Sequence, residues 1–308
     1  MRQRIGVHRC LGETPSEWRQ PMTIDPAYLL GLPPRITHHN LTRRDTILYA
    51  LGVGAGHDPD DRSELPFVYE DGLQALPTMP VVLAYPGFWQ KEPSYGIDWK
   101  RLLHGEQSVT LHAPLPVEGE LRGETTIDMI VDKGADKGAL LYASRRIYDN
   151  ANLLLATVRQ VSFLRGDGGC GGPGGQPIPP HPIPERPCDA TATMQTRPEQ
   201  ALLYRLSGDY NPLHLDPAVA AEAGLPRPIL HGLCTFGVAG RAVLKLLCGN
   251  DSSRLKRLDC RFTAPTFPGD AIRVSVWREG PGRAAFQADV PGRNVLALNN
   301  GYVEFEEN

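Results

Sequence analysis

One stretch decides the fold that this sequence can adopt: Gly232-Leu-Cys-Thr-Phe-Gly-Val-Ala-Gly-Arg-Ala-Val-Leu-Lys-Leu-Leu247. Its apolar residues recur at steps of three and four, which predicts a helix that begins near Gly232 and buries one face. That face consists of Leu233, Phe236, Gly237, Gly240, Leu244 and Leu247. Because glycine has no side chain, the two glycines on this face are expected to let a sheet approach the helix closely.

Alternating apolar and polar residues follow this helix to the end of the chain and predict strands. Alternation with a period of two and one buried face is typical of antiparallel sheets. The predicted strands are Leu258 to Phe262, Ile272 to Trp277, Ala284 to Val290, and Val295 to Phe305. A long apolar helix beside a curved antiparallel sheet is the hot-dog arrangement, which belongs to the α+β class.

A shorter helix is predicted before the long one. Thr196 and Glu199 have the spacing of a capping box, and Pro198 between them suits the first turn of a helix. The helix is therefore expected to start at this box. It should end at Gly208, since glycine commonly terminates helices.

Glycine and proline dominate residues 166–187, which begin Gly-Asp-Gly-Gly-Cys-Gly-Gly and continue as Pro-Ile-Pro-Pro-His-Pro. Such a composition sustains neither a helix nor a central strand, so it predicts a linker between a first half, residues 23–165, and a second half, residues 188–308. Gly166, Gly168 and Gly171 match the dinucleotide fingerprint G-x-G-x-x-G. That fingerprint requires a following helix, whereas prolines follow here, so no nucleotide cofactor is predicted.

The two halves resemble copies of one unit. Leu48-Tyr-Ala-Leu51 in the first half matches Leu203-Tyr-Arg-Leu206 in the second. Further on, His112-Ala-Pro-Leu-Pro116 resembles Thr263-Ala-Pro-Thr-Phe-Pro268. The nearly constant spacing between the matched stretches indicates a duplication. We therefore predict a double hot dog, in which each half is a curved antiparallel sheet around a central helix.

The composition excludes several classes of protein. The chain has 308 residues, of which 41% are hydrophobic and 22% charged, enough for a substantial packed core. A net charge of -3 argues against nucleic acid as a partner, and no apolar run reaches the roughly 18 residues that a membrane span requires. Six scattered cysteines lack the spacing of a zinc site, so no metal is predicted. They are interpreted as reduced structural thiols, with a reactive Cys234 as the alternative.

The two termini carry no recognised targeting signal. Residues 1–22 mix charges without the apolar core of a secretory signal, and they are expected to form an extension outside the fold. The final Glu306-Glu307-Asn308 is not a peroxisomal address of the Ser-Lys-Leu kind. A cytoplasmic location is therefore the expectation.

The segment Ser207-Gly-Asp-Tyr-Asn-Pro-Leu-His214 carries the most chemical information. Asp209 and His214 lie on either side of the turn-forming pair Asn211-Pro212, so both side chains can face one point. An imidazole can take a proton from water near neutral pH, and a carboxylate can exchange one with a neighbouring carbon. A structural interpretation stays open from the spacing alone: Asp209 caps a turn, and His214 packs at the surface.

The downstream segment Pro228-Ile-Leu-His-Gly-Leu-Cys-Thr235 adds a candidate for charge stabilisation. Gly232 stands at the start of the long helix, where a backbone N–H has no partner inside the helix. The positive end of a helix suits a carbonyl oxygen that gains negative charge, and a glycine leaves room for a thioester. A glycine required for packing alone would give the same pattern.

Together these segments resemble the MaoC-like family, and most closely the hydratase-2 domain of eukaryotic multifunctional beta-oxidation enzymes. The resemblance covers the chain from about residue 23 to the end, and Gly-Asp-x-Asn-Pro-x-His is its specific motif. In the first half, His104-Gly-Glu-Gln107 and Asp132-Lys-Gly134 agree as well. The resemblance implies Asp209 and His214 as the catalytic pair, Asn211 as their supporting polar group, and the Gly232 N–H as the oxyanion donor.

The resemblance also implies a substrate site, a reaction and an assembly. The implied acyl-CoA site consists of His104, Gly105, Lys133, Tyr210, Pro212, Leu213 and Phe262. Water held between Asp209 and His214 would attack C3 of a trans-2-enoyl-CoA, and the product would be (3R)-3-hydroxyacyl-CoA. No cofactor beyond the substrate's own coenzyme A is implied, and a homodimer is expected.

Other functions stay open at this point. A hot-dog acyl-CoA thioesterase would use the same fold and the same oxyanion helix, and a dehydratase could act on a branched or carrier-protein-bound acyl thioester. A non-catalytic acyl-CoA binding module is a third reading, although it would be expected to lack Asp209 or His214.

The first half is predicted to be degenerate and to serve the substrate's acyl chain. Aligning the copies places Gly54 opposite Asp209, and the following residues offer no Asn-Pro-x-His, so His57 is interpreted as a surface loop residue. The run Val81 to Trp89 stands where the second half has its long helix, and its prolines predict a broken helix. The space this leaves could hold an acyl tail, so we expect one active site per chain and a preference for medium or long chains.

Overall fold

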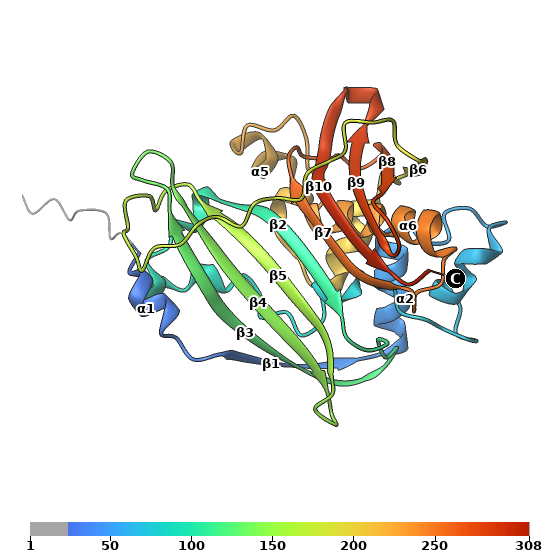
Figure 1. The fold of residues 1–308 in the computed structure, drawn as a ribbon, viewed down its shortest axis with the longest axis horizontal. Coiled ribbons are helices and arrows are strands. Elements are labelled where there is room, and N and C mark those ends of the chain that lie inside the picture. Colours follow the sequence, from blue (N-terminus) through green and yellow to red (C-terminus); the bar gives the residue numbers. More distant parts are fainter. Residues whose placement is uncertain (1–23, 308) are drawn as a thin grey trace, which may run out of the picture.

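Ten strands form one continuous antiparallel sheet in the computed structural model, which describes residues 24–307. The strand order is β1-β3-β4-β5-β2-β7-β10-β9-β8-β6, so the sheet curves from the first half of the chain into the second (Figure 1). The extension predicted for residues 1–22 lies outside the described residues.

The first half contributes five strands and short helices. Its strands are β1 (Arg35–Leu41), β2 (Leu102–Leu111), β3 (Gly119–Asp132), β4 (Ala139–Asp149) and β5 (Leu154–Leu164). Its α-helices are α1 (Pro26–Leu30), α2 (Arg43–Gly52) and α3 (Leu65–Val68). Single turns of 3-10 helix lie between them: η1 (Arg62–Glu64), η2 (Met79–Val81), η3 (Trp89–Lys91), η4 (Pro93–Tyr95) and η5 (Trp99–Arg101).

The second half repeats this plan around one long helix. Its strands are β6 (Ala190–Gln195), β7 (Leu255–Phe262), β8 (Ala271–Arg278), β9 (Arg283–Val290) and β10 (Val295–Phe305). Its helical segments are α4 (Gln200–Tyr204), η6 (Arg205–Ser207), η7 (Pro212–His214), α5 (Pro217–Glu222), α6 (Gly232–Cys248) and η8 (Pro291–Arg293). The long helix and the four strands predicted from the sequence are confirmed. Strand β6 was not predicted, because four of its six residues are alanine or threonine and only Met194 is a large apolar residue.

The duplication is visible in the topology. The first five strands have the order β1-β3-β4-β5-β2, and the last five, read from the other edge, have the corresponding order β6-β8-β9-β10-β7. Strands β2 and β7 occupy equivalent places and pair with each other, from Glu106 with Arg261 to Thr110 with Arg257. The predicted double arrangement, an α+β fold, is therefore confirmed, with the two copies joined along one pair of strands.

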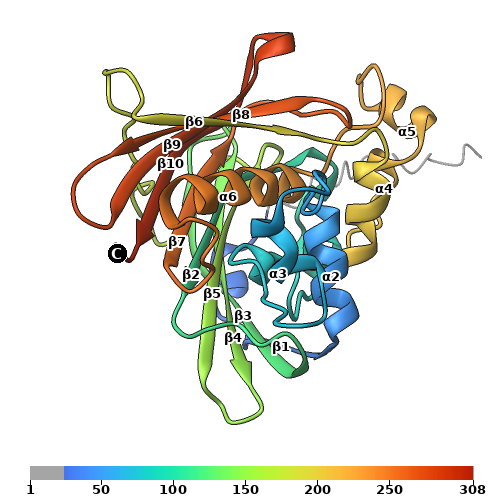
Figure 2. The ribbon, with the colours of Figure 1, turned by 90° about the vertical axis from the view of Figure 1, so that its right-hand side faces the viewer.

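The copies differ most at their central helix. Helix α6 crosses the inner face of the second-half sheet (Figure 2), and thirteen of its 17 residues are buried. At the corresponding place in the first half, the described chain holds only η2 followed by turns through residue 88. Pro80 inside η2 and Pro86 after it explain why no long helix forms there. The prediction of a broken first-half helix is confirmed.

The glycines of α6 make their close contacts differently from the prediction. A Cβ on Gly237 would collide with Val53 at the end of α2, and one on Gly240 would collide with Thr78 beside η2. Only the second contact of Gly240, with Leu258 of β7, involves the sheet. Helix α6 is thus held between its own sheet and the first-half elements, and the glycines admit the latter.

The predicted capping box is wrong. Helix α4 begins at Gln200, and the Thr196 hydroxyl instead donates to Asp270 O at 2.7 Å and accepts from the Gly269 N–H at 3.0 Å. Thr196 directly follows strand β6, so the hydrogen bonds of a neighbouring turn satisfy it before the helix starts. The predicted end of the helical segment is correct, because Gly208 has φ of +116°.

The segment from 166 to 187 contains neither helix nor strand and crosses the outer face of the sheet (Figure 1). Its second part is anchored there: Asn300 donates to His181 O at 2.8 Å, and Trp277 Nε1 donates to Arg186 O at 2.7 Å. Among the described residues, no helix is long and apolar enough to cross a membrane. The described cysteines are free thiols.

Candidate active site

A tight loop after η6 brings the acid and base candidates together. Gly208 ends the helical segment, and the Asp209 carboxylate then accepts a hydrogen bond from the Asn211 N–H at 3.2 Å. The Asn211 side chain in turn accepts from the Leu213 N–H at 3.1 Å and caps η7, which ends at His214. Asn211 therefore fixes the path of the loop between the two side chains.

Three side chains meet at this point: Asp209, His214 and His231. One carboxylate oxygen of Asp209 and one ring nitrogen of each histidine all lie within 4.8 Å of one another. The imidazole rings of His214 and His231 are stacked, with centroids 3.6 Å apart and an angle of 27° between the planes. Asp209 does cap a turn, as the structural interpretation expected, but it also faces two imidazoles. His214 is buried rather than packed at the surface.

Backbone carbonyls fix the protons of both imidazoles. His214 Nδ1 lies 2.9 Å from Ile229 O, and His231 Nε2 lies 3.1 Å from Asp209 O. A carbonyl oxygen only accepts, so these nitrogens carry the protons. His214 is thereby left with an unprotonated Nε2, the atom that a general base requires.

Burial keeps both imidazoles neutral near pH 7. Desolvation lowers the pKa of His214 below 6.5, although the bond to Ile229 and the charge of Asp209 act in the opposite direction. Desolvation, with a smaller contribution from His214, lowers the pKa of His231 to about 4. A neutral His214 can accept a proton from water over the physiological pH range.

The start of α6 lies beside this cluster. Gly232 is the first residue of the helix, directly after His231, and within residues 24–307 its N–H has no hydrogen-bond acceptor. A Cβ at this position would lie 3.4 Å from the ring of Phe262, which itself contacts the ring of His104 at 4.7 Å between centroids. The glycine therefore leaves room beside the Phe262 ring, next to an N–H that is available as a donor.

The other predicted substrate-site residues are spread more widely. Gly105 lies at a bulge in the pairing of β2 with β5, next to His104. Tyr210 is 59% exposed, with Arg205 over its ring, and Pro212 begins η7. Lys133 lies over the ring of Phe163 at 5.2 Å and forms no hydrogen bond or ion pair with Asp209 or His214. Their roles in binding remain predictions.

His231 is the functional candidate that the sequence analysis missed. It bonds the Asp209 backbone, stacks on His214 and precedes Gly232, so it links the loop to the start of α6. The ring of Tyr204 packs against the His231 ring, with centroids 4.9 Å apart. The available signal was position: a histidine directly before the proposed oxyanion glycine.

A metal ion does not fit this cluster as it stands. Aspartate and two histidines are a common ligand set, and each histidine donates its other N–H to a carbonyl, as metal ligands do. An ion must, however, lie in the plane of each coordinating ring at about 2.0–2.1 Å. Two stacked rings in nearly parallel planes cannot both meet that condition without turning.

The interpretation of Cys234 as a structural thiol fits the geometry better than the reactive alternative. Its side chain is fully buried, and its Sγ donates to Gly52 O at 3.3 Å. Burial raises the pKa of this thiol far above its usual range, so the reactive thiolate does not form near neutral pH.

These features define the class of protein. Residues 39–166 match the model of the MFE-2 hydratase 2 N-terminal domain, and residues 181–299 match that of the MaoC-like domain. The chain belongs to the MaoC-like dehydratase family, in its hydratase 2 group, and is a hydro-lyase. The resemblance inferred from the sequence is confirmed.

Individual relatives cover almost the whole chain. The 3-hydroxyacyl-thioester dehydratase Y of Mycobacterium tuberculosis is 42% identical, over 86% of this chain and 92% of its own length. The peroxisomal enoyl-CoA hydratase 2 of Arabidopsis thaliana is 39% identical, over 87% of this chain and 91% of its own.

Solved structures agree on the fold. A MaoC-like dehydratase from Phytophthora capsici superposes with a TM-score of 0.83 at 36% identity, covering 92% of this chain and all of that one. A Mycobacterium tuberculosis protein described as a double hotdog has a TM-score of 0.56 at 14% identity, covering 89% of this chain and 96% of that one. The latter likeness supports the fold alone.

Proposed function

We propose that this enzyme adds water reversibly to trans-2-enoyl-CoA and forms (3R)-3-hydroxyacyl-CoA. The observation that carries the proposal is the free Nε2 of a neutral His214 beside the Asp209 carboxylate. Next to them is the Gly232 N–H, which has no acceptor within the described residues. The names of the relatives point to the same substrates, hydroxyacyl thioesters and enoyl-CoA. The (3R) configuration rests on the family resemblance.

The proposed mechanism uses these three groups in one step. A water held between Asp209 and His214 gives one proton to the pair as its oxygen bonds to C3 of the enoyl thioester. The pair returns one proton to C2, so it ends with as many protons as it held at the start. The Gly232 N–H meets the negative charge that develops on the thioester oxygen, a contribution of about 3 kcal/mol.

The acyl tail is proposed to lie in the first half. A cavity of about 280 Å³ borders Gly208, next to the catalytic aspartate. Its apolar lining comes from α2, from the broken-helix region and from η6: Leu48, Tyr49, Met79, Val82, Leu83 and Leu206. We attribute this cavity to the broken helix, because a full helix would occupy more of the same region. Each methylene buried there contributes up to about 0.8 kcal/mol.

One assay separates hydration from thioester hydrolysis. Incubation with an enoyl-CoA should remove the ultraviolet absorbance of the conjugated thioester without releasing free thiol, and chiral analysis should return the (3R) alcohol. Release of thiol would support the thioesterase alternative, and a mainly (3S) product would contradict the assignment.

Substrate selection needs a second assay. Values of kcat/KM for chains of four to sixteen carbons, as coenzyme A and as carrier-protein thioesters, should favour medium or long acyl-CoA. A steady fall beyond four carbons would show that the first half closes the site. The predictions of a homodimer and of a cytoplasmic location stand on the sequence and are tested by solution mass and cell fractionation.

A further inference from the structure

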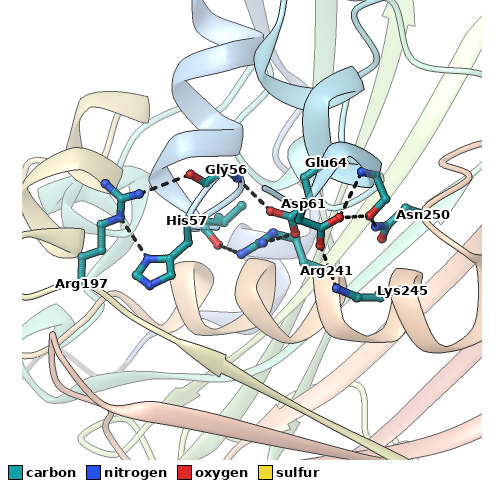
Figure 3. A network of polar contacts seen from close by, with 10 residues as sticks. Gly56, His57, Asp61, Glu64, Arg197, Arg241, Lys245 and Asn250 are labelled. Carbon is teal, nitrogen blue, oxygen red and sulfur yellow. Dashed lines mark hydrogen bonds and ion pairs between the residues drawn. The ribbon is translucent and has the colours of Figure 1, made fainter. Parts of the chain in front are cut away.

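A buried ion pair joins α6 to the first-half loop after α2 (Figure 3). Arg241 of α6 binds Glu64 of η1, and the two residues are only 7% and 6% exposed. Arg241 Nη1 also donates to Val53 O at 3.0 Å, and Glu64 Oε2 accepts from the Gly56 N–H at 2.8 Å. Both charges are therefore bonded to the backbone of the same loop.

The same stretch of backbone also holds the segment that leads to Asp209. Gln200 of α4, itself fully buried, donates to Leu51 O at 3.0 Å and to Gly52 O at 2.6 Å. Helix α4 and η6 run directly into the loop of Asp209, whereas α6 starts at Gly232. The end of α2 thus contacts both elements that carry the proposed catalytic groups. We call Arg241, Glu64, Gln200 and the backbone of residues 51–56 the clamp.

The clamp occupies the first-half counterpart of the catalytic loop. Gly54 aligns with Asp209, and a Cβ on Gly54 would lie 3.1 Å from Arg241 Nη1. The guanidinium group of Arg241 thus lies beside Gly54, the first-half position that corresponds to Asp209. In some proteins a buried charged network selects one arrangement of packed elements, because only that arrangement pairs every charge.

We propose that Arg241 and Glu64 are positioning residues, which hold the Gly232 N–H in place against Asp209 and His214 by fixing α6 relative to α4. This inference rests on the proposed hydratase function. Arg241 follows Gly232 by nine residues on one continuous helix, so a shift at the clamp moves the donor with it. A displacement of about 1 Å at a catalytic group can cost about 100-fold in rate.

The test removes the charges together. In Glu64→Gln/Arg241→Met no unpaired buried charge remains, and the new amide can still accept from the Gly56 N–H. We expect kcat to fall about 10- to 100-fold while KM stays within twofold. A para-dimethylaminocinnamoyl-CoA probe, whose absorption moves to the red when its thioester oxygen accepts a hydrogen bond, should show a smaller shift than in the wild type.

The single variant Arg241→Met leaves the buried Glu64 charge without its partner, so it should have a lower Tm than the double variant. If the double variant keeps wild-type kcat and the full spectral shift, the pair is structural only and the proposal is overturned. Lys245→Gln is the matched control, since Lys245 joins α6 to the same loop through an exposed pair with Asp61; it should stay within twofold of the wild type. An equal loss in that control would also overturn the proposal, whereas a wild type without hydratase activity would refute the proposed function instead.

Discussion

Two loops follow equivalent helices in the two halves, and they differ in the arrangement of their carboxylate and imidazole side chains. After α4 and η6, the loop of residues 208–214 presents Asp209 and His214 to one point. After α2, the loop of residues 53–64 presents Glu64 to Arg241, while His57 is exposed and accepts from Arg197 Nε at 3.2 Å. On our proposals, the loop of the second half supplies the catalytic side chains, and the loop of the first half holds α6 in position relative to α4.

The central helices show the same division. Helix α6 runs for 17 residues and starts at Gly232, whose N–H has no acceptor in the described part of the chain. Its counterpart η2 is a single turn, whose carbonyls at Pro80 and Val81 accept from the buried Arg145 at 3.0 and 2.8 Å. A single turn has almost no macrodipole to offer an oxyanion. On our proposal, the first half therefore has neither the loop nor the helix that a second catalytic centre would need.

The largest expected effect comes from the proposed catalytic pair, Asp209 and His214. Asp209→Asn and His214→Gln should each lower kcat by about 10³-fold, because positioned acid–base catalysis supplies two to four powers of ten. Steady-state hydration of a medium-chain enoyl-CoA measures this. His57→Gln, the matched change in the first-half loop, should stay within twofold. Comparable losses in both loops would remove the distinction between the copies.

A smaller loss is expected from removing the proposed oxyanion donor, the Gly232 N–H. Gly232→Pro removes one N–H, and proline is tolerated as the first residue of a helix. The preceding His231 has ψ of 137°, which a following proline allows. We expect kcat to fall about 10²- to 10³-fold, against a few-fold for Gly232→Ala, which keeps the donor. Equal activity of the two variants would show that the N–H does not act on the substrate.

The smallest effect is in the pH dependence of the wild type. His214 must be neutral to accept a proton, and burial lowers its pKa, so activity should persist below pH 6.5 before it falls. The free energy of unfolding should also decrease as the pH falls below 6.5. The pKa values of His104 and His231 are each lowered to about 4, so the unfolded chain gains protons first as pH falls below 6.5. An acidic limb of kcat/KM centred above 6.5 would contradict this account.

The sequence predicted the elements with strong periodicity and the residues next to them in the chain. Helix α6 and strands β7 to β10 follow from local spacing. Spacing also drew attention to Asp209 and His214, but their proposed catalytic role came from the family resemblance. His231 and Arg241 could not be assigned in this way, since their roles depend on contacts with residues distant in sequence, such as Asp209 and Glu64. The predicted capping box at Thr196 failed for the same reason, because the Thr196 hydroxyl bonds a turn around Gly269, which is distant in sequence.

The central claim, one active site per chain and only in the second half, is tested most directly by counting. Asp209→Asn should still bind trans-2-enoyl-CoA while it turns over too slowly to consume it. Calorimetric titration of this variant should give one molecule of enoyl-CoA per chain, with no hydration during the experiment. A stoichiometry of two, or hydration that persists at the wild-type rate, would show that the first half holds a working site of its own.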